Sequence, residues 1–495
     1  MRRRDFLWLT LGGSAYASLG RAAALQQSVL DAIGAQLPAR TLDGAATTIP
    51  TSNVGDLAAS LRGRVLLAGD PAYDQARRVW NAQWDRRPAL IAQCESPSDV
   101  MQAVVFARDH RLLTAVKAGG HSATGKSTCD GGIMIDLTPM NSVRVDPVAQ
   151  RARLETGALL RDLDRETRPF SLVTTAGTVS HTGAAGLTLG GGFGRVGRHF
   201  GLACDNLVSA DVVTADGRLV HASGAENPDL LWGLRGGGGN FGVATSLEYA
   251  LHPMNPMILG GMLSWPLDKL ERVLARYAEF VAGAPDELNL DLKIVPAGPR
   301  AGVIMEACWS ADHAAGEKVL GPLRAFEKPV VDTVGPMPYV TLQASADESL
   351  RGGQIHYAKA GFVTQLTPGL IARMVEVMTV RPPPRYGLSF QLGGGAIGRV
   401  PVATTAFPNR TGTYWLMISE LWGDRTESDA RVAEVRAAWQ QFEPYTDGFY
   451  VNAMTDDMYK GVRENYGPNY PRLQQLKKRY DPGNQFRLNA NITPA

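Results

Sequence analysis

The sequence Lys-Ala-Gly-Gly-His-Ser fills positions 117–122 and directly follows an apolar, strand-like run over residues 112–116. Adjacent glycines let a backbone approach a phosphate closely, because no Cβ atom stands in the way. His121 follows the two glycines, so its ring is expected at the edge of the molecule that carries the phosphate. This arrangement predicts a site for a phosphate-bearing ligand.

Two further glycine-rich stretches lie in the same half of the chain, over residues 186–194 and 235–242. Three such loops predict a long, extended cofactor with phosphates. The third spells Gly-x-Gly-x-x-Gly over 237–242, but a helix is expected before it and a strand after it. Dinucleotide sites of the Rossmann type need the opposite order, strand then helix. The pattern therefore predicts a packed glycine turn here.

Composition places the chain among ordinary multidomain globular proteins. It has 495 residues, 44% hydrophobic and 20% charged, with a net charge of +2. No basic stripe with interleaved aromatics is present, so we expect no nucleic-acid partner. The four cysteines form no CxxC pair, which argues against a disulfide framework and against a metal site, and predicts buried free thiols.

The first 24 residues resemble a twin-arginine export signal. Three arginines at positions 2–4 precede a short apolar run over 6–11, and small residues follow at 15–17 and 22–24. A disordered basic tail is the alternative. The apolar run is too short to span a bilayer, so we expect no stable membrane anchor. The signal predicts a periplasmic or secreted protein that meets the twin-arginine export machinery in transit.

The remaining chain divides by pattern into an N-terminal extension or linker (25–62) and two larger parts. In the first part, Ser96 and Pro97 predict the start of a helix that runs to His110, and Asp216-Gly217 predicts a hairpin turn. The second part, 255–445, alternates strands and helices and predicts an α+β domain with a mostly antiparallel sheet. Its expected strands are 288–295, 303–308, 388–392 and 414–421, and its expected helices are 267–282, 314–326, 367–380 and 429–442.

Several motifs together resemble the FAD-linked oxidases of the vanillyl-alcohol-oxidase superfamily, which have a PCMH-type FAD-binding domain. Within it the chain resembles the berberine-bridge-enzyme-like branch, in its mono-covalent bacterial form. The motifs occur in the family's order at 116–122, 177–194, 204–207, 240–243 and 480–489. The resemblance implies an α+β fold with a two-part FAD-binding domain, 63–254, completed by a returning C-terminal segment, 446–495. The substrate domain, 255–445, is inserted between them.

The resemblance also implies how FAD is held. The Gly119-Gly120 backbone cradles the pyrophosphate, and His121 is covalently attached to the 8α-methyl carbon of the flavin. Many relatives have a second, cysteinyl link at the position of Val179, so this chain is expected to lack it; Cys204 lies beyond the matching position. The expected cofactor-binding residues are Lys117, Ala118, Gly119, Gly120, His121, Ser122, Gly125, Gly177, Thr182, Gly183, Gly186, Gly190, Val243, Tyr450 and Asn489.

Catalysis in the family passes a hydride from the substrate to flavin N5 while a base takes a proton. The resemblance makes Tyr450, with Asn452, the candidate base; a core aromatic at a domain boundary is the alternative. Free tyrosine titrates near about 10, so this role needs a nearby cation or hydrogen bonds. Ala453 stands where relatives commonly have another tyrosine.

The middle domain is expected to supply the substrate floor from Gln391, Met417, Ser419 and Glu420, although Glu420 fits a solvated strand position better. Met417 stands about where some relatives have a glutamate or glutamine, which weakens the case for a base there. Thr182 matches a position near the flavin's reactive edge, where a small β-branched side chain leaves room for oxygen.

These features predict an FAD-dependent oxidoreductase acting on an alcohol, a sugar lactol or an amine. Dioxygen is the expected electron acceptor, giving hydrogen peroxide. Two alternatives are a dehydrogenase that uses a quinone or another acceptor, and a non-catalytic periplasmic protein that binds flavin or another ligand.

Overall fold

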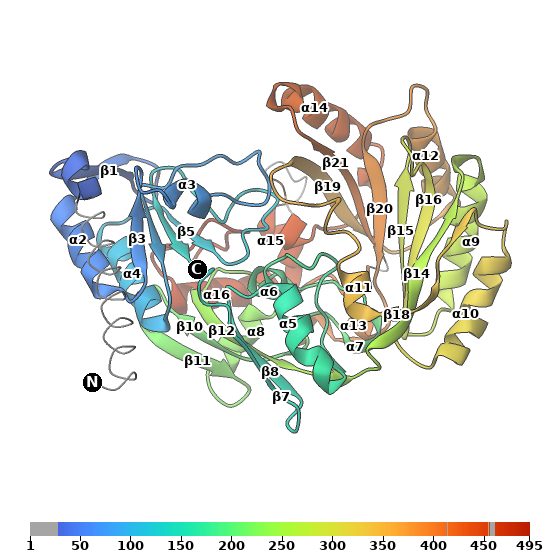
Figure 1. Cartoon of the computed structure of the whole chain (residues 1–495), viewed down its shortest axis with the longest axis horizontal. Coiled ribbons are helices and arrows are strands. Elements are labelled where there is room, and N and C mark those ends of the chain that lie inside the picture. The colour runs from blue at the N-terminus through green and yellow to red at the C-terminus, as the bar shows by residue number, and fades with distance from the viewer. Residues whose placement is uncertain (1–27, 413, 454, 456–460) are drawn as a thin grey trace, which may run out of the picture.

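The computed structural model describes residues 28–412, 414–453, 455 and 461–495. The chain forms two lobes that lie side by side, with the N-terminal half in one and an eight-stranded sheet in the other (Figure 1). The sheets are mostly antiparallel and alternate with helices, so the predicted α+β class is confirmed. The predicted export signal lies outside the described residues.

The first lobe begins with a small mixed sheet that leads into the first glycine stretch. Its strands, in spatial order, are β3 (Arg64–Leu67), β4 (Leu90–Gln93), β6 (Ile133–Asp136) and β5 (Thr114–Lys117). Strands β4 and β5 both run parallel to β6. Helix α4 (Pro97–Asp109) joins them, and the Ser96 side chain caps it by accepting from the Asp99 backbone N–H, as the sequence predicted.

The described part of the segment that we predicted as an N-terminal extension or linker (25–62) is an ordered part of this lobe. Strands β1 (Gln36–Arg40) and β2 (Ala46–Pro50) form a hairpin, and α2 (Thr51–Ser60) follows directly. Leu37, Ile49 and Val54 are buried in the same core as α4. So few apolar residues, set so far apart, give no readable period, and their burial depends on contacts with the rest of the lobe.

A second, five-stranded antiparallel sheet completes the first lobe. Its strands, in spatial order, are β11 (Leu219–Ser223), β10 (Leu207–Val213), β12 (Val243–Ala250), β8 (Arg151–Glu155) and β7 (Val143–Asp146). Helices α5 (Leu160–Thr167), α6 (Ala184–Leu189) and α8 (Pro228–Leu234) pack near it. The third glycine stretch connects α8 to β12, which is the helix-then-strand order that argued against a Rossmann site.

The second lobe is one large antiparallel sheet. Its strands, in spatial order, are β17 (Val331–Asp332), β14 (Met257–Trp265), β16 (Gly302–Trp309), β15 (Leu288–Val295), β20 (Gly387–Leu392), β21 (Tyr414–Trp422) and β19 (Ile355–Val363), with β18 (Gly335–Pro338) also paired to β14. Helices α9 (Leu270–Ala282), α10 (His313–Ala325) and α12 (Pro368–Met378) cover the face turned away from the first lobe (Figure 1). Alternate residues such as Leu292, Leu388 and Leu416 fill that covered face, which leaves the other face toward the first lobe.

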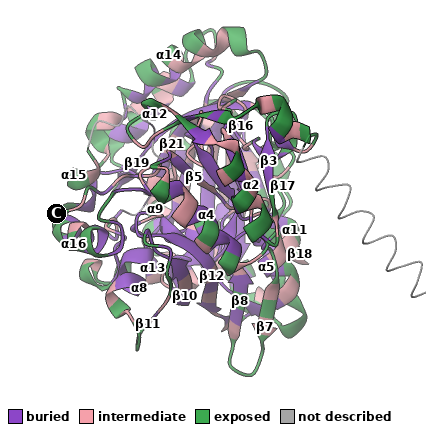
Figure 2. Ribbon diagram, turned by 90° about the vertical axis from the view of Figure 1, so that its left-hand side faces the viewer, coloured by how far each residue is buried: buried purple, intermediate pink, exposed green. Residues whose placement is uncertain are grey.

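The C-terminal segment returns to the first lobe through α15 (Val462–Tyr466) and α16 (Tyr470–Tyr480), as Figure 1 shows. The fully buried ammonium of Lys477 donates to the Asp481 carboxylate at 2.7 Å, and to the carbonyls of Asn240 at 2.8 Å and Phe486 at 2.9 Å. Such a buried ion pair holds only because the remaining ammonium donors are also satisfied. It fixes the third glycine stretch against the turn that follows α16. Figure 2 shows that the strands inside the molecule are mostly buried and that the helices around them have exposed residues.

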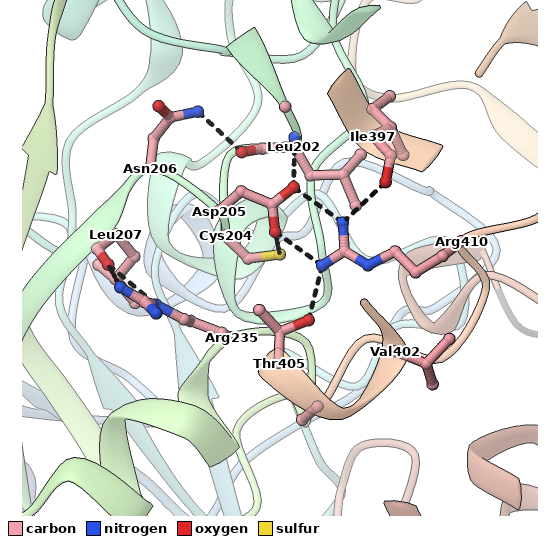
Figure 3. A network of polar contacts seen from close by, with 12 residues as sticks. Leu202, Cys204, Asp205, Asn206, Leu207, Arg235, Ile397, Val402, Thr405 and Arg410 are labelled. Carbon is pink, nitrogen blue, oxygen red and sulfur yellow. Dashed lines mark hydrogen bonds and ion pairs between the residues drawn. The ribbon is translucent and has the colours of Figure 1, made fainter. Parts of the chain in front are cut away.

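A second buried ion pair joins the two lobes. Arg410, from the second lobe, donates to both carboxylate oxygens of Asp205, at 2.8 and 2.6 Å, and also to the hydroxyl of Thr405 (Figure 3). The Arg410 side chain is 2% exposed and that of Asp205 is 10% exposed. The Cys204-Asp205-Asn206 stretch therefore anchors one lobe on the other.

Candidate active site

A cavity of about 370 Å³ lies where the three glycine stretches, the C-terminal segment and the inner face of the large sheet meet. The structure brings most of the predicted site residues to its wall. These are Ala118, Gly119, Gly120, His121, Ser122, Gly177, Thr182, Gly183, Gly186, Val243, Tyr450, Asn452 and Asn489. The third glycine stretch also contributes Gly238 and Gly239, so it forms part of the site rather than only a packed turn.

Three predicted cofactor-binding residues lie off the cavity and support its wall. The ammonium of Lys117 donates to the carbonyl of Ala76. Gly125 has a φ of +64°, and a Cβ there would come within 2.2 Å of the Trp84 side chain. A Cβ on Gly190 would meet the Asn452 amide at 2.1 Å. At these three positions the motif residue is needed for packing. A motif alone does not tell a packing residue from one that contacts the ligand.

The glycines of the wall are of two kinds, and both fit a long ligand. Gly119 and Gly183 pack against each other so closely that a Cβ on Gly119 would lie 2.4 Å from the Gly183 Cα. Gly186 and Gly239 line the cavity and have no atom within 4 Å of an added Cβ. The first pair sets the shape of the wall, and the second pair leaves room for a bound group.

His121 projects from the first glycine stretch to the cavity. Its ring stacks on Trp80, with centroids 4.4 Å apart, and lies 5.2 Å from the ring of His181. Burial, reinforced by His181, lowers the pKa of His121 to about 3. The imidazole is therefore neutral at physiological pH and keeps a lone pair for bonding. Trp80 belongs to no motif, and nothing in the sequence indicated its role.

Three buried polar atoms at the wall lack any hydrogen-bond partner among the described residues: Nε2 of His121, Nε1 of Trp415 and Oδ1 of Asn489. Such atoms are rare in proteins and often mark a ligand. Together with the open space beside Gly186 and Gly239, they fit the FAD that the sequence implies.

No cysteine lines the cavity among the residues that the structure describes. Val179 occupies the wall at the position of the family's second link. Cys204 is buried beside Asp205, and burial raises the pKa of its thiol far above the usual range. All four cysteines are free and buried, as predicted.

Tyr450 and Asn452 also line the cavity, next to the second glycine stretch. The Tyr450 hydroxyl oxygen accepts hydrogen bonds from the Gly192 backbone N–H, at 2.9 Å, and from the Asn452 amide, at 2.8 Å. Burial raises the pKa of Tyr450 to about 12, while these two donors act to lower it. The two hydrogen bonds that favour a basic tyrosine are present, but burial outweighs them, so the pKa is raised and not lowered as the basic role requires.

The inner face of the large sheet closes the cavity above Tyr450. Gln391 and Trp415 are direct cross-strand neighbours on β20 and β21, and both line the wall. Gln391 donates to the Thr178 hydroxyl at 3.3 Å, and the Trp415 ring meets the Tyr450 ring edge-on at 5.2 Å. The indole N–H of Trp415 is buried without a partner in the described structure, so it is available to a substrate. The sequence did not single out Trp415.

The other predicted floor residues do not line the cavity. Met417 and Ser419 alternate with Ile418 along β21 and so share the face of Trp415. Glu420 lies on the opposite face, where it is 4% exposed and forms an ion pair with Arg431. The prediction that Glu420 is solvated was wrong, because helix α14 (Ser428–Trp439) covers that edge of the sheet.

The described part of the chain contains no group of three or more His, Cys, Asp or Glu side chains placed to hold a metal ion. None of its helices has both the length and the apolar character needed to cross a lipid bilayer.

Two family models match the chain: "FAD binding domain" over residues 88–223 and "Berberine and berberine like" over residues 449–493. They cover much of the first lobe and most of the returning segment, which together supply most of the cavity wall.

Full-length relatives agree with these matches. An FAD-linked oxidoreductase of Dictyostelium discoideum is 31% identical over 450 residues, covering 90% of this chain and 97% of the relative. The (R)-6-hydroxynicotine oxidase of Paenarthrobacter nicotinovorans is 30% identical over 456 residues, covering 88% and 97%.

Solved structures show the same fold. The crystal structure of 6-hydroxy-D-nicotine oxidase from Arthrobacter nicotinovorans superposes with a TM-score of 0.80 at 28% identity, covering 88% of this chain and 99% of that one. A chitooligosaccharide oxidase gives a TM-score of 0.80 at 25% identity, covering 89% and 99%. The chain belongs to the FAD-linked oxidoreductases of the berberine-bridge-enzyme-like branch of the vanillyl-alcohol-oxidase superfamily.

Proposed function

We propose that this FAD-linked oxidoreductase oxidises an alcohol, a sugar lactol or an amine in its neutral form, with FAD tethered to His121 alone and dioxygen as the electron acceptor. One observation carries the proposal. A neutral imidazole and a hydrogen-bonded phenol, His121 and Tyr450, line the same glycine-walled cavity.

The residues that would hold FAD are those of the glycine walls, with Gly119 and Gly120 near the pyrophosphate and Asn489 as a further polar contact. When bound, FAD supplies the acceptor for a hydride from the substrate. A tether through His121 fits the neutral ring, and the aliphatic side chain of Val179 offers no second attachment.

Tyr450 is the proposed proton acceptor from the substrate O–H or N–H. The Gly192 and Asn452 donors stabilise negative charge on the phenol oxygen, as backbone and amide donors do at other anion sites. The unpaired Trp415 N–H is placed to donate to a substrate oxygen.

The scarcity of charged groups in the cavity lining limits the kinds of substrate that can bind there. Among the described residues its lining includes no carboxylate, and its one ammonium, Lys126, donates to the Asn489 carbonyl. Nothing there balances a substrate cation, and a buried unpaired charge is costly. This favours neutral substrates, such as alcohols and lactols, over charged amines.

Thr182 supports dioxygen as the acceptor. Thr182 lines the cavity, as do Val179 and Gly183, and threonine has the compact, β-branched shape that leaves space for a diatomic molecule.

The test is anaerobic reduction of the purified holoenzyme by a panel of alcohols, lactols and amines, followed by reoxidation in air or with a quinone. The proposal predicts that a neutral substrate bleaches the flavin and that air restores it with release of hydrogen peroxide. Bleaching by no member of the panel would support a binding protein. Reoxidation by quinone but not by air would support a dehydrogenase.

We also propose that the protein is exported by the twin-arginine route, from the arginines at positions 2–4 and the apolar run that follows. The double variant Arg3→Lys/Arg4→Lys should leave the full-length precursor in the cytoplasm. Equal export of this variant would contradict the proposal.

A further inference from the structure

A second cavity, of about 380 Å³, lies between the two lobes. Helix α5 of the first lobe supplies one part of its wall, and α11 (Tyr339–Gln343) of the second lobe supplies another; the two helices contact each other at the junction (Figure 1). The polar lining residues are Arg161, Asp164, Arg165, Arg168, Ser180 and Gln343. These six residues are distinct from those that line the proposed FAD cavity.

The three arginines lie on one face of α5 and the turn that follows it, because their spacing is i, i+4, i+7. Arg165 forms ion pairs with Asp162, at 3.4 Å, and with Glu166, at 3.0 Å. Arg161 and Arg168 are exposed and form no ion pair among the described residues. A helix of this length separates them by about 10 Å along its axis. Two free guanidinium groups at this spacing suit a ligand with an acidic group at each end.

The buried part of the cavity presents hydrogen-bond acceptors. Asp164 is 5% exposed and accepts from the Gln343 amide at 3.3 Å. The same amide donates to the Ala176 carbonyl at 2.6 Å, while the other amide atom of Gln343, Oε1, is buried with no partner among the described residues. The Ser180 hydroxyl is already bound to Asp347. Because a buried acceptor without a donor is rare in proteins, these groups indicate a ligand that brings hydroxyl donors.

We propose that this cavity is a second binding site, for a small dicarboxylic acid that carries hydroxyl groups between its two ends. Its carboxylates pair with Arg161 and Arg168, since a guanidinium binds a carboxylate through two parallel hydrogen bonds. Its hydroxyls donate to Oε1 of Gln343 and to the Asp164 carboxyl group. The site goes beyond the proposed oxidation, and no step of that reaction passes through it.

The carboxyl group of Asp164 does not exclude an acidic ligand. Burial raises the pKa of Asp164 to about 7, so a large part of this group is neutral at physiological pH. Arg161 and Arg168 also outnumber it. The cavity therefore favours an anion, in contrast to the FAD cavity, which favours a neutral substrate.

The loop that follows Val179 contributes to both cavities. Ser180 lines the second cavity, whereas Val179, Thr182 and Gly183 line the FAD cavity. Asp347 of the second lobe accepts from the Ser180 N–H at 2.8 Å and from its hydroxyl at 2.5 Å. A ligand in the second cavity contacts both lobes and this loop, so its binding should raise the melting temperature of the protein.

The experiment measures binding to the full-length holoenzyme by isothermal titration calorimetry at neutral pH, with three acids of the same chain length. D-Glucarate has a carboxylate at each end and hydroxyls between them. Adipate keeps both carboxylates and lacks the hydroxyls, and D-gluconate keeps the hydroxyls and lacks one carboxylate. The protein variants are Arg161→Gln, Arg168→Gln and the control Arg144→Gln, an exposed arginine of β7 that lines neither cavity.

We expect one glucarate to bind per chain and to raise the melting temperature. Adipate and gluconate should each bind about 10-fold more weakly or worse, since each loses hydrogen bonds to a charged or buried group. Arg161→Gln and Arg168→Gln should each weaken glucarate binding by about 10- to 100-fold, and Arg144→Gln should bind like wild type. All three arginines are exposed, so their replacement tests binding without unfolding the chain.

No glucarate binding to wild-type protein would overturn the proposal, as would equal weakening in Arg144→Gln. Adipate that binds as tightly as glucarate would show that the buried acceptors do not contact the ligand, and gluconate that binds as tightly would remove the need for a second acid. Trp415→Phe, in the FAD cavity, should leave glucarate binding unchanged. A loss there, with none in Arg161→Gln, would place the ligand in the FAD cavity and contradict the second site.

Discussion

The side-chain amide of Asn452 donates a 2.8 Å hydrogen bond to the hydroxyl oxygen of Tyr450, two positions earlier in the chain. The same amide donates to the Leu187 carbonyl at 2.8 Å, which fixes its orientation. Asn452 therefore links the returning C-terminal segment to helix α6 and directs an N–H toward the proposed proton acceptor. Burial raises the pKa of Tyr450 and hydrogen bonding lowers it, and burial has the stronger effect.

Replacing Tyr450 by Phe removes the proposed proton acceptor and keeps the ring. We expect the rate of anaerobic flavin reduction by substrate to fall about 100- to 10,000-fold, the usual contribution of a general base. The flavin content should not change. An unchanged rate would show that another group takes the proton.

The pH dependence of the flavin reduction rate should report the titration of Tyr450. Because the pKa of Tyr450 is raised to about 12, the phenolate fraction, and with it the reduction rate, should rise about tenfold per pH unit below that value. Asn452→Ala removes a donor that lowers this pKa, so the pKa rises further and the rate falls at each pH. A profile shifted toward lower pH in this variant would contradict the assignment.

A substitution at Gly186 tests whether FAD lies against this part of the cavity wall, without disturbing the fold. It lies in α6 and a Cβ there would meet no protein atom, so Gly186→Ala should not destabilise the protein and should favour the helix by about 1 kcal/mol. The added methyl enters the space proposed for FAD and should weaken FAD binding by about 1–3 kcal/mol. Titration of flavin-free protein measures both effects against Gly224→Ala, an exposed glycine off the cavity that also has open space. Equal FAD affinity in the two variants would place the cofactor elsewhere.

The buried Arg410–Asp205 pair should be strongly coupled. Arg410→Leu leaves the Asp205 carboxylate without its counter-ion inside the protein, which costs about 3–5 kcal/mol of unfolding free energy. Asp205→Leu should cost a similar amount. The double variant should lose clearly less than the two single losses together when unfolding in urea is measured. Additive losses would mean that the pair does not join the lobes.

Local signals in the sequence located many elements but missed several strands, among them β14 and β19. The Ser96 cap, Pro97 and the polar end at His110 fix helix α4 within a few residues. Strand β14 was missed because Gly260 and Gly261 interrupt its apolar run. Gly261 is there because a Cβ would lie 2.5 Å from the Thr333 carbonyl, in a neighbouring segment that no local pattern reveals.

Strand β19 was not predicted, for a different reason. All nine of its residues are buried, including His356 and Lys359, so the expected alternation of polar and apolar residues is absent. The His356 ring, for example, contacts Trp80, which the first lobe provides.

Site residues that belong to a sequence motif could be predicted, whereas residues that reach the site through tertiary packing could not. His121, the glycine walls, Tyr450 and Asn452 all follow from stretches with a readable pattern. Trp80 and Trp415 were not predicted, because each reaches the cavity region from a segment that carries no motif and is placed by tertiary contacts alone.

The central claim is that FAD occupies this cavity and is bound covalently through His121. The most direct measurement is acid denaturation of the purified yellow protein, followed by mass analysis of the peptide that contains His121. The account predicts that flavin stays with the wild-type polypeptide, on that peptide, and is released from His121→Ala. Flavin released from wild-type protein, or protein that stays colourless after incubation with FAD, would contradict it.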